Sequence, residues 1–299
     1  MTSPARSSGP ITAAVVGGVA WNLVVQVPRL PTDLTSLPAD GHRWGVGGTG
    51  AGKALHLAAL GVRTRLHALL GEDESGAKIE AVLTDAGVDL TAWPDPAGTE
   101  SHLNLLDRHG DRLSIFLDRS SADPGVSGEE LLDFAAGSDL VFVSLTEYSR
   151  RVLPLLAGAG VPVWVDLHDW DGGGGDFHRP FVEHGDYVFV SDVRLDDPLE
   201  LATRLAATRR LVVVTHGARG ATAFFPDREP LFVPPYDAGP VADTNGAGDA
   251  FSVGVAYGVA RGWDLPRSLH AGAVLSGGCV AAPDIADRTL TSAWLEGRL

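Results

Sequence analysis

The sequence has a single cysteine, Cys279, and no apolar stretch of the length that a transmembrane helix needs. One cysteine excludes an intramolecular disulfide, and its apolar, Gly/Ala-rich surroundings indicate a small core residue. Residues 1–10 are rich in Ser and Pro and lack the apolar segment of a signal peptide, so we expect them to be disordered. These absences predict a protein of a reducing compartment, the cytoplasm, with no membrane partner.

Positive charge is also scarce. The chain has 23 Lys and Arg residues against 38 Asp and Glu residues, which gives a formal net charge of −15 and a pI of about 4.9. Such a surface repels nucleic acid and anionic lipid, so neither is an expected partner. An anionic small molecule is not excluded, because a local cluster of backbone N–H groups binds phosphate whatever the overall charge.

The second half of the chain alternates short apolar runs with helical segments. The expected strands are 141–144, 163–166, 187–190 and 211–215. The expected helices are 150–159, 177–183 and 199–207, and two apolar helices, 246–261 and 265–282, close the chain. Apolar runs of this length suit strands that are buried on both faces. The pattern predicts an α/β fold in which residues 11–299 form one domain around a doubly wound, mostly parallel sheet.

The segment 243–251, DTNGAGDAF, is the strongest functional signal in the chain. Thr244 or Asn245 can cap the helix that follows, and small residues in its first turn leave backbone N–H groups free for a ligand. The helix dipole adds to the attraction for an anion. Asp249 beside such a site either favours the dipole or accepts a proton from an attacking hydroxyl group, and these residues alone leave both roles open.

This segment resembles the C-terminal signature of the ribokinase-like, PfkB-type carbohydrate kinases. The resemblance implies a ribokinase-like α/β fold with a small β-sheet lid. It also implies transfer of the γ-phosphoryl group of ATP, with Mg²⁺, to a hydroxymethyl group of a sugar or nucleoside. Carried over by position, Gly246, Ala247 and Gly248 form the anion hole and Asp249 is the catalytic base.

A second segment, GGTGAGKA at 47–54, resembles the N-terminal signature of the same family. The resemblance assigns Gly47 and Gly48 to the acceptor. The family usually has Asn where Gly52 stands, and often Asp where Asn22 follows the first strand and turn. An Asn still donates and accepts hydrogen bonds, so Asn22 is expected to bind a changed acceptor. Asn104 alternates with apolar residues in a predicted hairpin and is a further candidate for acceptor binding.

The nucleotide-binding residues are predicted from the turn THGARG at 215–220, which resembles the family's nucleotide-binding turn. It assigns Thr215, Gly217 and Gly220 to ATP. The family's Asn-x-x-Glu motif is replaced here by residues 191–194, SDVR. Ser191 is still assigned to the nucleotide. Either Asp192 or Asp166 is a candidate for the Mg²⁺ shell, with Asp166 preferred, and the arginine at position 194 is a candidate phosphate ligand.

Segments 23–44 and 99–116 correspond to the lid of the family, and the second of them predicts a β-hairpin. A lid suits a kinase because it keeps water from the phosphoryl group. Exposed lid strands often pair between subunits, which predicts a homodimer.

Three rival interpretations fit less well. A P-loop at 47–53 lacks the hydroxyl that should follow Lys53, and a dinucleotide fingerprint at 45–50 lacks the acidic residue after the next strand. A metal hydrolase has no recognisable ligand spacing. A catalytically weak or inactive sensor of sugars or nucleosides on the same scaffold is the alternative that stays open. The altered segment 191–194 favours a sensor, and the presence of Asp249 argues against one.

Overall fold

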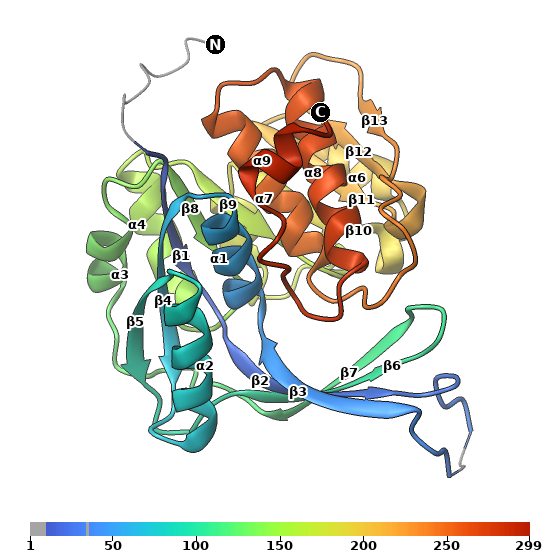
Figure 1. Ribbon diagram of the computed structural model, residues 1–299. Coiled ribbons are helices and arrows are strands. Elements are labelled where there is room, and N and C mark those ends of the chain that lie inside the picture. Colours follow the sequence, from blue (N-terminus) through green and yellow to red (C-terminus); the bar gives the residue numbers. More distant parts are fainter. Residues whose placement is uncertain (1–9, 34–35) are drawn as a thin grey trace.

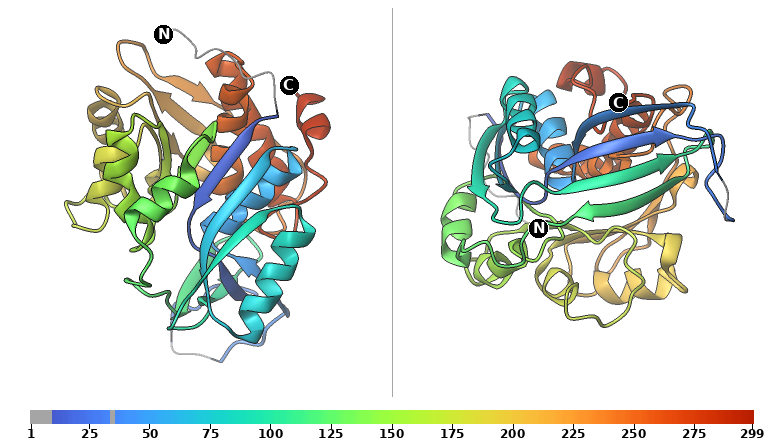
Figure 2. Two further views of the ribbon diagram at one scale, coloured as in Figure 1. Left: turned by 90° about the vertical axis from the view of Figure 1, so that its left-hand side faces the viewer. Right: turned by 90° about the horizontal axis from the view of Figure 1, so that it is seen from below.

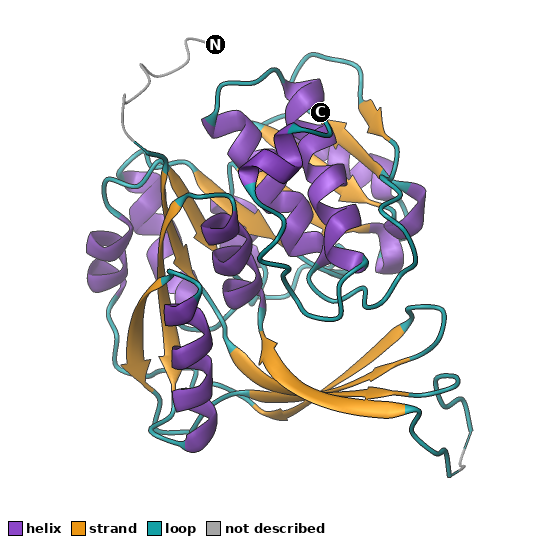
Figure 3. Ribbon diagram, in the orientation of Figure 1, coloured by secondary structure: helices purple, strands orange, loops and turns teal. Residues whose placement is uncertain are grey.

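The computed structural model describes residues 10–33 and 36–299, and in them the chain forms two sheets (Figure 1). The predicted fold class is confirmed: a large, mostly parallel sheet is flanked by helices, and a smaller sheet projects from it (Figure 3). The prediction of disorder for residues 1–10 falls almost entirely outside the described residues. Within the described residues, no helix has both the length and the apolar character that crossing a bilayer requires.

The larger sheet has nine strands among the described residues, in the order β13-β12-β11-β10-β9-β8-β1-β4-β5. Their bounds are β1 Thr12–Val16, β4 Arg63–Leu70, β5 Asp89–Pro94, β8 Leu140–Val143, β9 Val163–Asp166, β10 Tyr187–Ser191, β11 Leu211–Thr215, β12 Ala221–Phe224 and β13 Leu231–Val233. All neighbours from β11 to β5 run parallel, while β12 is antiparallel to both of its neighbours. The central strands β8 and β9 are buried at every residue, as their apolar runs predicted.

Helices cover both faces of this sheet because successive strand side chains point to opposite sides. In β1, Ala13 and Val15 join one core cluster while Ala14 and Val16 join the other. The first cluster includes side chains of α1 Thr49–Ala59, α2 Glu74–Asp85, α7 Ala247–Ala260, α8 Leu265–Val280 and α9 Ser292–Glu296. The second includes those of α3 Gly128–Ala135, α4 Leu153–Gly158, α5 Arg179–His184 and α6 Pro198–Ala206.

The smaller sheet has the strand order β3-β2-β6-β7 (Figure 2). Its strands are β2 Ala20–Gln26, β3 Gly41–Gly47, β6 Ser101–Leu106 and β7 Arg112–Asp118. These strands come from the two segments that the sequence assigned to a lid, and the predicted hairpin is the antiparallel pair β6–β7. Between β2 and β3, residues 34–35 lie outside the described residues. Figure 1 shows the sheet extending beneath the C-terminal part of the chain.

The two faces of the smaller sheet differ in chemistry. Strand register places Val24 opposite both Arg43 and Asn104, so Asn22, Arg43, Asn104 and Arg112 share one side, which we call the inner face. The same register places Leu23 opposite Trp44 and Leu103, and Leu103 opposite Ile115. The outer face is therefore apolar and is made by Leu23, Trp44, Leu103, Leu113 and Ile115.

Candidate active site

The residues assigned to the nucleotide lie at the carboxyl ends of neighbouring strands. Asp166 ends β9, Ser191 ends β10 and Thr215 ends β11, and the last two are paired in register. Gly217 and Gly220 follow in the turn to β12, both with positive φ. Ligands of doubly wound sheets bind at this edge. The structure therefore places these residues where a nucleotide site is expected, and their roles in binding stay a prediction.

The signature segment forms the turn that leads into α7. Gly246 is the N-cap residue, and its φ of 80° lies in the left-handed region that glycine adopts without strain. The prediction that Thr244 or Asn245 caps the helix is wrong, because both side chains hydrogen-bond to the smaller sheet instead. No described side chain caps this helix. The backbone N–H of Ala247 lies 3.4 Å from the carbonyl oxygen of Thr244, whereas the N–H of Gly248, the next residue of the first turn, is left for a ligand.

Asp249 lies in that first turn, inside a buried cluster of charges. Its side chain forms an ion pair with Lys53 of α1, and the same ammonium nitrogen lies 3.7 Å from Oδ2 of Asp166. Lys53 is 2% exposed, and Asp166 and Asp249 are each 7% exposed. Three segments that are far apart in sequence therefore meet around one nitrogen atom.

Burial and charge act in opposite directions in this cluster. Burial raises the pKa of Asp249 above its ordinary value, although Lys53 works against that rise. Burial alone would raise the pKa of Asp166 as well, but His168, Lys53 and the His168 N–H hold it below the usual value. Burial alone would lower the pKa of Lys53, yet the two carboxylates hold it above the ordinary value. Lys53 is therefore an ammonium ion that sits between two carboxyl groups.

Close backbone approach explains the glycine at position 52. A Cβ atom there would lie 2.6 Å from Oδ2 of Asp249, too close for a carbon and an oxygen that are not bonded. Gly52 therefore brings α1 up against the carboxylate, with Oδ1 facing Lys53 and Oδ2 facing the glycine. The sequence showed that the family's Asn is missing at position 52, and the structure shows what occupies that space.

The residues assigned to the acceptor meet where β2, β3 and α1 join. Asn22 is 4% exposed, and its Oδ1 has no hydrogen-bond partner among the described residues. Gly47 packs directly against the Asn22 amide, and Gly48, with a φ of 87°, caps α1. Asn104 is buried on the neighbouring strand β6. A buried carbonyl oxygen without a partner is costly, so Asn22 is suited to receive a hydrogen bond from a ligand.

The segment that departs from the family pattern has partners of its own. Oδ2 of Asp192 lies 2.8 Å from Nδ1 of His216 and 2.6 Å from Nη2 of Arg219. Arg194 is more than half exposed and lies 3.7 Å from Asp169 and 3.8 Å from Asp171. Asp192 is thus held by two basic groups, whereas the exposed Arg194 side chain stays a candidate phosphate ligand.

Asp166 is engaged on both of its oxygens. Oδ1 accepts the backbone N–H of His168 at 3.0 Å, and Oδ2 faces Lys53 and, at 3.6 Å, Nδ1 of His168. Among residues 10–33 and 36–299, no three His, Cys, Asp or Glu side chains are grouped as metal ligands. A carboxylate beside an ammonium group fits a contact with Mg²⁺ through water better than direct coordination.

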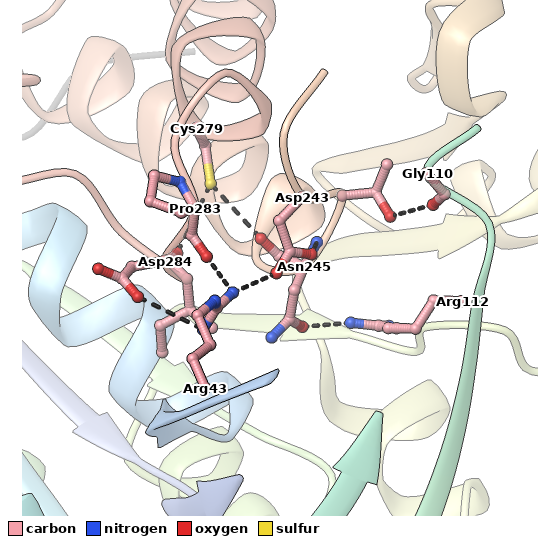
Figure 4. A network of polar contacts seen from close by, with 10 residues as sticks. Arg43, Gly110, Arg112, Asp243, Asn245, Cys279, Pro283 and Asp284 are labelled. Carbon is pink, nitrogen blue, oxygen red and sulfur yellow. Dashed lines mark hydrogen bonds and ion pairs between the residues drawn. The ribbon is translucent and has the colours of Figure 1, made fainter. Parts of the chain in front are cut away.

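Polar contacts join the smaller sheet to the signature segment (Figure 4). Arg43 of β3 pairs with Asp243 at 2.5 Å and donates to the carbonyl oxygen of Pro283. Arg112 of β7 donates to the side-chain oxygen of Asn245. Sequence reasoning missed both arginines, because nothing local marks a contact between segments more than a hundred residues apart.

Lys53 was missed for a different reason, because the sequence does mark it. It is the one charged residue in α1, whose sequence is TGAGKALHLAA, and a lysine on a buried helix face needs an acidic partner. The segment 47–54 and the failed P-loop match both contain Lys53, but neither pattern assigns it a role. Its position on an apolar helix was the signal that could have identified it.

Comparison with known proteins agrees with this geometry. A family model described as pfkB family carbohydrate kinase matches residues 184–286, which include the start of α7 and Asp249. Acarbose 7(IV)-phosphotransferase of Actinoplanes sp. is 33% identical over 270 residues, which is 87% of this chain and 89% of that protein.

Solved structures give the same result. The microbiome-derived acarbose kinase Mak1 superposes with a TM-score of 0.85 at 30% identity, covering 97% of this chain and 99% of the other. Ribokinase of Arabidopsis thaliana, complexed with ribose and ATP, has a TM-score of 0.77 at 22% identity and covers 96% and 99%, which supports the fold alone. Because the sequence likeness extends along nearly the whole chain, the protein belongs to the pfkB family of carbohydrate kinases and is a phosphotransferase that acts on an alcohol group.

Proposed function

We propose that the protein transfers the γ-phosphoryl group of ATP to a hydroxymethyl group of a sugar. One observation supports this most directly: the buried Asp249 carboxylate stands in the first turn of α7, beside N–H groups that no described side chain caps. A base next to an anion-binding turn is the arrangement that phosphoryl transfer to a hydroxyl group requires.

The residues divide the work of the reaction. The backbone N–H groups of Gly246, Ala247 and Gly248 hold the oxygens of the transferring phosphoryl group, and the dipole of α7 adds to this stabilisation. Asp249 accepts the proton of the acceptor hydroxyl as the hydroxyl oxygen attacks the γ-phosphorus, and the bond from that phosphorus to the β-phosphate oxygen breaks to release ADP. Catalysis by such a site is mostly positioning and charge stabilisation.

The nucleotide lies along the edge formed by Ser191, Thr215, Gly217 and Gly220. Mg²⁺, when bound with the nucleotide, neutralises charge on the phosphate oxygens. Asp166 would hold the ion through its water shell, because its oxygens are already engaged by Lys53 and His168. The exposed Arg194 contributes positive charge at the same edge.

The acceptor lies between the inner face of the smaller sheet and the start of α1, against Asn22, Gly47, Gly48 and Asn104. The orphaned oxygen of Asn22 suits a hydroxyl donor. The acarbose kinases are relatives at 30% identity or more over most of the chain, whereas a nucleoside kinase of Methanocaldococcus jannaschii is 21% identical. We therefore favour a sugar of the oligosaccharide or modified-sugar kind over a nucleoside.

The assembly proposed is a homodimer formed by the outer faces of two smaller sheets. Trp44, Leu113 and Ile115 expose between 41% and 52% of their surface on this face. A second copy would cover apolar side chains that one chain leaves in water.

The test is ATP consumption with Mg²⁺ across acarbose, simple sugars, sugar phosphates and nucleosides, with Asp249→Asn beside the wild type. The substitution removes the base while keeping its size, so turnover should fall by about 1,000-fold or more while ATP affinity is kept. Because burial raises the pKa of Asp249, wild-type activity should fall as pH drops through a value above that of an ordinary Asp.

Two outcomes would contradict the proposal. Turnover by Asp249→Asn at the wild-type rate would remove the assigned base. Tight binding of one acceptor without consumption of ATP would favour the sensor, with the replaced segment 191–194 as its cause.

A further inference from the structure

Lys53 is an unusual residue for this chain. The sequence has two lysines, and the other, Lys78, lies on α2 with 47% of its side chain exposed and pairs with Glu74. Lys53 is 2% exposed on a helix of small and apolar residues. Lysine is almost never buried so completely unless it is paired.

The groups around Lys53 define its charge. Asp249 of α7 and Asp166 of β9 are the ionised groups paired with its ammonium nitrogen, and His168 is a second basic group here, with its Nδ1 atom 3.6 Å from Oδ2 of Asp166. His56 on the same helix is fully buried and lies 3.1 Å from the Ile285 carbonyl oxygen, and burial lowers its pKa to about 4, which leaves it neutral. One ammonium group therefore serves two carboxylates.

Removing that charge would change the base. Two carboxylates that share a buried site without a cation do not both stay ionised, because each like charge disfavours the other. Asp249 would take up the proton, because His168 still faces Asp166 whereas Asp249 loses its ammonium partner, and Asp249 could then accept no proton from the substrate. A lysine that served packing alone would have no such effect.

Lys53 also sets which oxygen faces the substrate. Oδ1 of Asp249 accepts from the ammonium group, and Oδ2 lies over Gly52, where no side chain covers it. We propose that Lys53 is a positioning residue for phosphoryl transfer: its ammonium group holds Asp249 ionised and turned so that Oδ2, above Gly52, receives the proton of the acceptor hydroxyl. This inference rests on the proposed function.

The experiment is a double-mutant cycle with Lys53→Met, Asp166→Asn and their combination, and Lys78→Met as the matched control. Methionine keeps the length of the stem and removes the charge. Lys53→Met should lower kcat by about 100-fold while the KM values for ATP and acceptor change less than about threefold. Because Asp166 also has a proposed role at Mg²⁺, the comparison is made within the Asp166→Asn background, where Lys53→Met should cost at least about tenfold less kcat than it does in the wild type, since the competing charge is already gone. Lys78→Met should match the wild type.

Additive losses in the cycle would overturn the proposal, since a packing role predicts that the second substitution adds damage. A readout without turnover uses protein labelled with ¹⁵N-lysine, in which two side-chain signals are expected and Lys78→Met assigns them. Asp249→Asn should shift the Lys53 signal, and a signal that does not move would overturn the proposal. Absence of turnover in the wild type with every acceptor would instead count against the proposed function, and the labelled-lysine result would still test the Lys53–Asp249 pair on which the inference rests.

Discussion

The two sheets of this protein differ in which side chains they bury: the larger sheet buries charged groups, whereas the smaller sheet exposes apolar ones. At the carboxyl edge of the larger sheet, Lys53, Asp166 and Asp249 are charged and at most 7% exposed. On the outer face of the smaller sheet, Trp44 is 52% and Leu113 43% exposed. Buried charges must be held in one geometry by their partners, because any change leaves one of them unpaired. Exposed apolar side chains, by contrast, are not held by a partner in the same chain and can contact another molecule.

This contrast assigns different work to the two sheets. The larger sheet and α7 hold Asp249, the proposed base, and the turn at 244–248 in a fixed arrangement, which positioning catalysis demands. The smaller sheet touches the signature through a few polar contacts, chiefly those of Arg43 and Arg112. Of these contacts, the Arg43–Asp243 pair is itself buried on the Asp243 side, so it ties the smaller sheet to the signature at one fixed point.

The largest effect is expected from a side chain added at Gly248, in the turn proposed to bind phosphate. A Cβ atom at Gly248 would lie 3.7 Å from Oδ2 of Asp166, which is an ordinary van der Waals contact, so the backbone there does not itself exclude a Cβ atom. Gly248→Val should block the approach of phosphate to the backbone and lower kcat/KM by about 100-fold or more. Steady-state kinetics and ATP titration measure the effect, and Gly158→Val, at an open position in α4, is the control. Normal ATP affinity together with normal turnover would refute the anion hole.

A smaller effect is expected on the inner face of the smaller sheet. Asn22→Ala removes the buried amide that faces the acceptor and should raise the KM for the acceptor by about tenfold, with little change in the KM for ATP. Gln26→Ala, four residues along the same strand and exposed, is the matched control. If kcat falls and the KM for the acceptor stays constant, Asn22 acts on the chemical step rather than on binding.

The sequence predicted the larger sheet well because its strands are continuous apolar runs with helices between them. It placed β8 to β11 within a residue or two, and it identified the turn before α7 from one signature. It missed β5, an edge strand with mixed exposure, and α3, a helix of eight residues. Short or half-exposed elements have too little periodicity to be distinguished from loops.

The site was predicted in part, and the missing part has one physical cause. Asp249 could be singled out because the residues around it in sequence resemble the signature of the family, and its role as the base stays a prediction. Lys53 and Arg43 reach their partners across 196 and 200 residues of chain, so only the folded sheet order brings those groups together. Local sequence sets the backbone of a site, whereas charge balance within it depends on tertiary contacts.

The smallest effect on turnover is expected on the outer face. Ile115→Asp places a charge in the apolar surface of β7 and should shift the protein from dimer to monomer, because a buried unpaired carboxylate opposes association. Sedimentation velocity over a range of protein concentrations measures the shift, and kcat should stay within about twofold of the wild type. Val82→Asp, on α2 with the same 41% exposure, is the control for adding charge to an exposed apolar site. A wild-type protein that stays monomeric at every concentration would refute the dimer. A large loss of kcat in the Ile115→Asp monomer would show that the two sheets are less independent than their surfaces indicate.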